Sequence, residues 1–162
     1  MEAVVFIGIP ASGKSTFFRQ QFFRTYVRIS KDLLRTRNRE QVFLRACLET
    51  GQRFAVDNTN VLAQERALYI PQARNAKFRV RGYLFMTELK EALRRNAQRS
   101  PAEMVPARGL VSKFKELEPP SFAEGFDELF SVTITPERSF LVRPWVPEPQ
   151  GPLVAEAGEV VG

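Results

Sequence analysis

Residues 8–15 are the segment of the chain whose types and spacing point most directly to chemistry. Gly8, Gly13, Lys14 and Ser15 fit the pattern Gly-x-x-x-x-Gly-Lys-Ser/Thr of a phosphate-binding loop. In such a loop backbone N–H groups face the β-phosphate, the lysine reaches the β- and γ-phosphates, and the hydroxyl binds Mg²⁺. The sequence therefore predicts a nucleotide site. The residues expected to contact the nucleotide in this loop are Gly8, Pro10, Ala11, Ser12, Gly13, Lys14, Ser15 and Thr16.

The segments on either side have the strand-loop-helix order that such a loop requires. The apolar run 3–9 predicts a short strand that is buried on both faces, and residues 14–23 have helical spacing. A glycine-rich turn that carries a lysine by chance is the alternative. Because both the pattern and its setting match, we favour the phosphate-binding loop.

The rest of the chain alternates predicted strands with predicted helices, which indicates a parallel α/β sheet. Further strands are predicted at 26–29, 53–57, 78–85 and the end of 126–134. Helices are predicted over 30–51, with Ser30 as N-cap, and over 62–76, 88–99 and 106–117. We expect a three-layer sandwich of the P-loop NTPase and kinase type over residues 1–135, with about five parallel strands and a helical lid.

Two aspartates follow predicted strands, at the sheet edge where α/β proteins bind ligands. Asp57 is expected to hold Mg²⁺ through water, and a turn-capping residue is the alternative. Asp32 could accept the proton of an attacking hydroxyl, with Arg35 on the same helix face binding an acceptor phosphate. The alternative is a first-turn aspartate favoured by the helix dipole, with Arg35 as its local partner. Position alone does not choose between these two interpretations.

The predicted helix 88–99 is rich in arginine and ends at a Ser100-Pro101 break. Arg95 and Arg99 lie four residues apart and share one helix face. A solvated basic face is the common meaning of such a run. Beside a phosphate-binding loop, it favours a lid whose arginines neutralise the γ-phosphate during transfer. We expect Arg95 and Arg99 to contact the nucleotide, and Arg99 and Lys14 to act in catalysis.

Composition excludes several classes of enzyme. The 162 residues contain no histidine, which excludes Ser-His-Asp and Cys-His nucleophiles and His-containing zinc sites. The three aspartates lie too far apart for a paired Asp-x-Asp motif, and Cys47 is the only cysteine. No apolar run approaches the roughly 20 residues of a membrane span, and no signal segment is evident at the N-terminus. We expect a soluble, cytoplasmic protein with no membrane partner.

Charge divides the chain into two parts. Residues 1–135 contain 22 Lys and Arg against 14 Asp and Glu, a net charge of +8, which suits a polyanionic partner. Residues 136–162 are rich in proline and carry a net charge of −2. We expect residues 136–162 to be a C-terminal extension that is partly packed or disordered, with disorder in its last 10–15 residues.

The order and spacing of these motifs over roughly residues 3–135 resemble the kinase module of polynucleotide 5′-kinases, especially that of polynucleotide kinase-phosphatases. The phosphate-binding loop alone is shared by many kinases, and its combination with two later motifs is more specific. The matching segments are residues 8–16, Ser30-Lys31-Asp32 with Arg35, Asp57-Asn58-Thr59-Asn60, Arg94-Arg95-Asn96-x-x-Arg99, Val105-Pro106 and 120–126. Ala11, Lys31 and Asn58 depart from residues common in the family.

The resemblance implies transfer of the γ-phosphate of ATP, or another nucleoside triphosphate, to the 5′-hydroxyl of single-stranded DNA or RNA with Mg²⁺, in nucleic acid repair. It implies Asp32 as general base and Ser15 and Asp57 at the metal. The residues implied on the acceptor side are Arg35, Asp57, Asn58 and Asn60. A phosphatase or ligase is an implied partner.

Two other functions share these features. A small-molecule P-loop kinase would have a closed acceptor pocket and no dependence on oligomer length. A nucleotide-dependent regulator or toxin-like module would bind ATP without transferring phosphate to any 5′-hydroxyl end.

Overall fold

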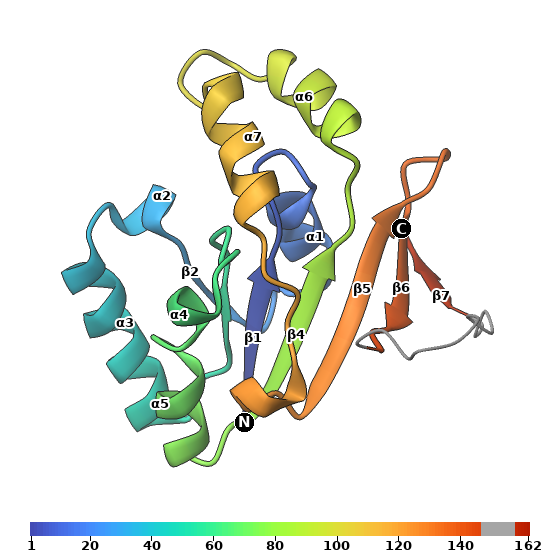
Figure 1. The fold of residues 1–162 in the computed structure, drawn as a ribbon. Coiled ribbons are helices and arrows are strands. Elements are labelled where there is room, and N and C mark those ends of the chain that lie inside the picture. The colour runs from blue at the N-terminus through green and yellow to red at the C-terminus, as the bar shows by residue number, and fades with distance from the viewer. Residues whose placement is uncertain (147–157) are drawn as a thin grey trace.

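The computed structural model describes residues 1–146 and 158–162, and these form one sheet with helices on both faces (Figure 1). Its strand order is β2-β3-β1-β4-β5-β6-β7. The parallel strands are β1 (Glu2–Ile7), β2 (Val27–Ile29), β3 (Phe54–Val56), β4 (Arg79–Phe85) and β5 (Glu128–Ile134). The predicted sandwich and its five parallel strands are confirmed.

Two further strands extend the sheet antiparallel to the rest. β6 (Phe140–Pro144) pairs with β5, and β7 (Glu159–Val161) pairs with β6. Both lie within the predicted C-terminal extension, so the sheet has two antiparallel strands in addition to the five parallel strands that were predicted. Residues 147–157, which include most of the segment predicted to be disordered, lie outside the described residues.

The alternation of side chains along β1 explains the three layers. Val5 and Ile7 face one buried cluster, and Val4 and Phe6 face the other. Helices α3 (Arg37–Thr50) and α5 (Ile70–Asn75) close the first cluster, and α1 (Lys14–Gln21) closes the second with two phenylalanines and with a third at its C-cap. A strand that is apolar on both faces is shielded from water only when a layer of helices covers each face of the sheet.

Two predicted helices are each divided in the structure. The helix expected over 30–51 consists of α2 (Lys31–Leu34) and α3, because the chain turns at Arg35 with a φ of 72°. The helix expected over 62–76 consists of α4 (Ala63–Arg66) and α5, and Pro71 at the start of α5 has no N–H to donate to a continuous helix. Ser30 does precede α2, but its side chain makes no capping hydrogen bond.

The lid and the approach to β5 complete the chain. The lid consists of α6 (Leu89–Ala97) and α7 (Ala107–Glu116), which stand above the carboxyl ends of the strands (Figure 1). A short 3₁₀ turn, η1 (Phe122–Glu124), leads into β5. Among the described helices, none has the length and apolar character needed to cross a membrane.

A buried ion pair joins the segment after β3 to this turn. The Arg66 side chain is fully buried, and its Nε and Nη2 donate to Glu124 at 2.6 and 3.0 Å. Its Nη1 donates to the carbonyls of Asn60, Val61 and Glu118 at 2.9, 3.2 and 3.1 Å. Arg66 therefore fixes the chain that leads away from β3, and Glu124 supplies its counter-charge.

This arrangement predicts that the substitution Arg66→Met is strongly destabilising. It leaves Glu124 and three carbonyls without their donor, and breaking a buried pair on one side costs about 3–5 kcal/mol. Urea denaturation measures the loss in free energy of unfolding. The matched control is Arg74→Met, which breaks the more exposed Arg74–Asp127 pair and should cost about 0–1 kcal/mol. Equal losses in the two variants would contradict the assignment.

Candidate nucleotide and acceptor site

The phosphate-binding loop follows β1 and enters α1 at Lys14. Two of its positions need glycine. A Cβ on Gly8 would lie 2.9 Å from both Phe85 Cβ and Ser12 Oγ. Gly13 has a φ of 95° and would bring a Cβ to 3.1 Å from Phe140. The sequence pattern of the loop thus reflects close packing against the ends of the neighbouring strands.

The Lys14 ammonium group lies buried inside this loop. Its Nζ donates to the carbonyls of Gly8 and Ile9 at 3.0 and 2.8 Å. Burial lowers its pKa to about 8, and the positive charge of Arg99 acts in the same direction, whereas the carboxylates of Asp57 and Asp32 oppose the shift. Three predicted site residues from distant parts of the sequence therefore lie near enough for their charges to act on Lys14.

A compact cluster of polar side chains connects α1, β2 and the end of β3. Ser15 Oγ donates to Asp57 Oδ2 at 2.9 Å. Arg28, in the middle of β2, donates from Nε to the same carboxylate oxygen at 2.7 Å and from Nη2 to Ser15 Oγ at 3.1 Å. Sequence reasoning missed Arg28. Its only sequence signal is a charged residue between two apolar strand positions.

The pair of oxygens from Ser15 and Asp57 suits Mg²⁺. A hydroxyl and a carboxylate oxygen are hard ligands, and Mg²⁺ is commonly bound by one or two such groups together with substrate phosphates and water. Within the described part of the chain, no three Asp, Glu or Cys side chains gather into a metal cluster. Ser15 and Asp57 would hold the ion, which supplies neutralising charge beside the phosphates.

The two asparagines predicted on the acceptor side are engaged within the protein. Asn58 Oδ1 accepts from the backbone N–H of Lys31 at 2.9 Å, and Asn58 Nδ2 donates to Glu40 at 2.7 Å. Asn60 is buried and donates to the Phe6 carbonyl at 2.9 Å. Asn58 thus attaches the turn that carries Asp32 to the loop after β3. Acceptor contacts of Asn58 and Asn60 stay a prediction.

A buried network supports Asn58 from the other side. The Glu40 side chain is fully buried, and Arg37 donates to it at 2.7 Å. The Tyr69 hydroxyl lies 3.3 Å from each carboxylate oxygen of Glu40 and accepts from Asn58 at 3.2 Å. Burial, aided by the Glu40 charge, raises the pKa of Tyr69 to about 12, so the hydroxyl stays protonated.

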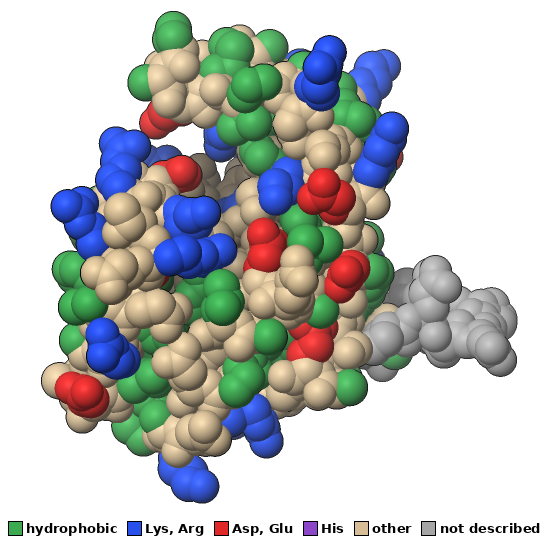
Figure 2. All heavy atoms as spheres, turned by 60° about the vertical axis from the view of Figure 1, so that its left-hand side comes forward, with side chains coloured by type: hydrophobic (Ala, Val, Ile, Leu, Met, Phe, Trp, Pro, Cys, Tyr) green, Lys and Arg blue, Asp and Glu red, His purple; other side chains and the backbone are tan. Residues whose placement is uncertain are grey.

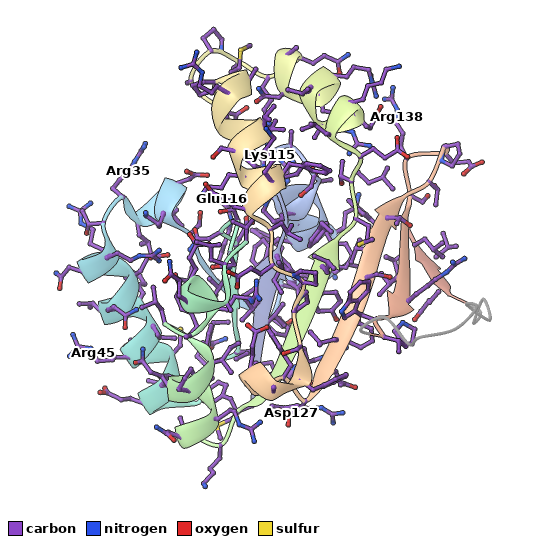
Figure 3. All side chains as sticks on the ribbon, viewed as in Figure 1. Arg35, Arg45, Lys115, Glu116, Asp127 and Arg138 are labelled. Atoms are coloured by element: carbon purple, nitrogen blue, oxygen red, sulfur yellow. The ribbon has the colours of Figure 1, made fainter. Side chains whose placement is uncertain are left out.

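Asp32 and Arg35 do not share a helix face, and the expectation that they would is wrong. Asp32 is exposed in the first turn of α2, which ends at Leu34 before Arg35 is reached. Arg35 is exposed, and Figure 3 shows its side chain pointing outward from the turn between α2 and α3. Any contact between Arg35 and an acceptor phosphate would therefore be made at the outer rim of the site.

The lid is attached to the phosphate-binding loop by apolar packing. Ile9 of the loop packs with Ala92 of α6 and Leu110 of α7. Asn96 closes the lid because its side chain accepts from Val105 N at 3.0 Å and donates to Val105 O at 2.6 Å. These two hydrogen bonds give a structural reason for an asparagine at position 96, between Arg95 and Arg99.

The two predicted lid arginines differ in their surroundings. Arg95 lies 3.4 Å from Glu91, and its Nη1 is buried without a protein partner among the described residues. Arg99 donates to the Glu103 carbonyl at 3.4 Å, and its charge acts on Lys14. Arg99 is thus positioned toward the phosphate-binding loop, and Arg95 retains donor capacity.

Comparison with known sequences shows to which family the chain is similar. Residues 35–118 match a family described as an AAA domain. A bifunctional polynucleotide phosphatase/kinase of Schizosaccharomyces pombe is 31% identical over 81 residues, which cover 49% of this chain and 20% of that protein. The chain therefore spans about a fifth of the length of this relative.

Comparison with solved structures establishes the fold. Chaetomium thermophilum Kti12 in complex with ADP-AlF3 is 17% identical with a TM-score of 0.58, covering 84% of this chain and 92% of that one. A gluconokinase from Sinorhizobium meliloti is also 17% identical, with a TM-score of 0.58 and 82% of each chain covered. A structure of the PezAT toxin-antitoxin system of Streptococcus pneumoniae has a TM-score of 0.64 at 16% identity, covering 86% of this chain and 69% of that one. The sandwich is that of P-loop kinases.

The lowered pKa of Lys14 predicts that nucleotide binding weakens as pH rises above about 8. Below that pH the ammonium group is charged and binds phosphate, whereas the neutral amine above it does not attract the anion. Titration with a fluorescent ATP analogue should show affinity falling roughly tenfold from pH 7 to pH 9. Lys14→Arg keeps its charge and should give a flat profile. A flat profile for the unaltered protein would refute the prediction.

Proposed function

Because the chain belongs to the AAA-domain family that residues 35–118 match, and has the fold of P-loop kinases, we propose that it is a polynucleotide 5′-hydroxyl kinase. It transfers the γ-phosphate of ATP, or another nucleoside triphosphate, to the 5′-hydroxyl end of single-stranded DNA or RNA. The observation that carries the proposal is the 31% identity to a polynucleotide phosphatase/kinase along 49% of this chain.

The charge around the site supports a polyanionic acceptor. Lys31, Arg35 and Arg39 are exposed along α2 and the start of α3, beside Asp32. Figure 2 shows Lys and Arg side chains gathered along the hollow between the lid and the body of the protein. Phosphate groups of a single strand bind such a surface through charge that is independent of base sequence. An open basic rim suits a long oligonucleotide acceptor better than a small molecule that binds in an enclosed pocket.

The chemistry requires positioning, positive charge and one base. The Asp32 carboxylate accepts the proton of the 5′-hydroxyl. At the same time the hydroxyl oxygen forms a bond to the γ-phosphorus, and the bond from the γ-phosphorus to the β-phosphate oxygen breaks. Lys14, Arg95 and Arg99 stabilise the charge on the transferred group, and the nucleoside diphosphate leaves. Ser15 and Asp57 would hold Mg²⁺, which would supply further neutralising charge. A phosphatase or ligase that acts on the same ends, in nucleic acid repair, would be a partner of this activity.

A small-molecule kinase is the second candidate. Its support is the fold likeness to the gluconokinase, because such a kinase would use the same loop, base and lid. The two functions differ in the acceptor. A polynucleotide kinase should prefer longer oligonucleotides, because more phosphates reach the basic rim, whereas a small-molecule kinase gains nothing from length.

Transfer of label from γ-³²P-ATP tests the proposal. The acceptors are 5′-hydroxyl DNA and RNA oligonucleotides of increasing length, with nucleosides and sugar acids in parallel. We expect label on oligonucleotide ends, with kcat reduced by about 10²–10⁴-fold in Asp32→Asn and transfer lost in Lys14→Ala. The matched control is Asp127→Asn, because Asp127 lies at the opposite end of the molecule from α2 and the lid (Figure 3).

The other outcomes contradict either the proposed activity or the assignment of the base. Label on a sugar acid or nucleoside, with none on oligonucleotides, would establish the small-molecule kinase. Nucleotide binding without transfer to any acceptor would establish a regulator. Near-complete transfer by a folded Asp32→Asn variant would reject Asp32 as the base.

A further inference from the structure

Arg28 contacts both protein oxygens that are assigned to the metal. Its Nε donates to Asp57 Oδ2 at 2.7 Å and its Nη2 donates to Ser15 Oγ at 3.1 Å, and Nη2 also lies 2.7 Å from Asp57 Oδ2 in an ion pair. These are the same oxygens that lie 2.9 Å apart in the Ser15–Asp57 hydrogen bond. One cationic side chain therefore uses the ligands that a Mg²⁺ ion would use.

Burial explains why Asp57 needs this partner. Its side chain is only 2% exposed, and a buried carboxylate requires a nearby positive charge or several hydrogen bonds. Lys14 lies nearby, but its Nζ donates to loop carbonyls and not to Asp57. Arg28 makes the direct ion pair.

Arg28 is also placed so that it can leave. It belongs to β2, the strand at one edge of the sheet, and its side chain is 31% exposed. A long arginine side chain at an edge can rotate into water while its charge stays solvated. Asp57, which is almost fully buried, has no comparable freedom.

We propose that Arg28 is an internal counter-ion that competes with Mg²⁺ for Ser15 and Asp57. Arg28 must leave these oxygens before they can bind the ion, so the protein alone binds divalent metal weakly. The phosphates of a nucleotide add negative charge beside Asp57, which favours exchange of the guanidinium group for the doubly charged ion. Metal and nucleotide therefore enter together. The inference rests on the proposed function, because it takes Ser15 and Asp57 as the metal ligands.

Binding of Mn²⁺ without nucleotide tests the proposal. Mn²⁺ accepts the same oxygen ligands as Mg²⁺, and electron paramagnetic resonance measures its unbound concentration. We expect Arg28→Ala to bind one Mn²⁺ at least tenfold more tightly than the unaltered protein. The gain should disappear in Arg28→Ala with Asp57→Asn. Arg74→Ala removes an arginine from the Arg74–Asp127 ion pair and should leave Mn²⁺ binding unchanged.

Two conservative variants guard against a folding defect. Arg28→Gln removes the charge and keeps a polar side chain, so it should also bind Mn²⁺ more tightly, whereas Arg28→Lys should resemble the unaltered protein. Equal Mn²⁺ affinity in the unaltered protein and in folded Arg28→Ala and Arg28→Gln would overturn the proposal. No acceptor or nucleotide enters this assay, so its outcome is separate from a failure to phosphorylate oligonucleotides.

Discussion

The buried ammonium group of Lys14 is the feature on which the rest of the site depends. A charge removed from water must be compensated by hydrogen bonds and opposite charge. The Gly8 and Ile9 carbonyls supply the hydrogen bonds, and Asp57 and Asp32 supply the opposing charge. The loop can bring its carbonyls to Lys14 only because glycine at position 8 permits close packing on Phe85. Nucleotide phosphates would offer the same ammonium group a stronger partner than the carbonyls.

A second set of buried polar groups keeps the site edges in register. Arg66, Glu40 and Asn58 each bond more than one segment, so that the loop after β3, the start of α2 and the approach to β5 are held together. Arg66 thus connects the backbone of Asn60, in the Asp-Asn-Thr-Asn motif, to Glu124 of the Glu-Gly-Phe segment. The Asn60 side chain donates a hydrogen bond to the backbone of β1, and the Glu124 carboxylate neutralises the charge of Arg66. Asp32 lies exposed at the start of α2, whereas Lys14 is buried inside the phosphate-binding loop.

The sequence was sufficient for the parallel part of the fold because apolar strands and helical spacing alternate along it. It predicted Lys14, Asp32 and Asp57 at one edge of the sheet and Arg99 on a lid, and the charges of Asp32, Asp57 and Arg99 all act on Lys14 in the structure. The role of Arg28 could not be predicted from the sequence. Its partner Asp57 is distant in sequence, and Arg28 belongs to no recognisable sequence motif.

The errors have physical causes as well. The break at Arg35 depends on a left-handed turn that helical spacing does not reveal, since the apolar positions continue beyond it. Composition predicted an extension after Pro136 that is partly packed or disordered, and it did not specify which residues pack, because composition carries no information on long-range strand pairing. Phe140–Pro144 finds a partner in the free edge of β5. Pairing of this kind depends on which strand edge is available in the folded sheet.

The most direct measurement is a crystal structure with Mg²⁺, a non-hydrolysable ATP analogue and a 5′-hydroxyl oligonucleotide. It should place the γ-phosphate beside Lys14 and Arg99 and the terminal 5′ oxygen within hydrogen-bonding distance of the Asp32 carboxylate. The strand should run across the basic rim of α2 and α3. A terminal oxygen bound away from Asp32, with the phosphates correctly seated in the loop, would contradict the account.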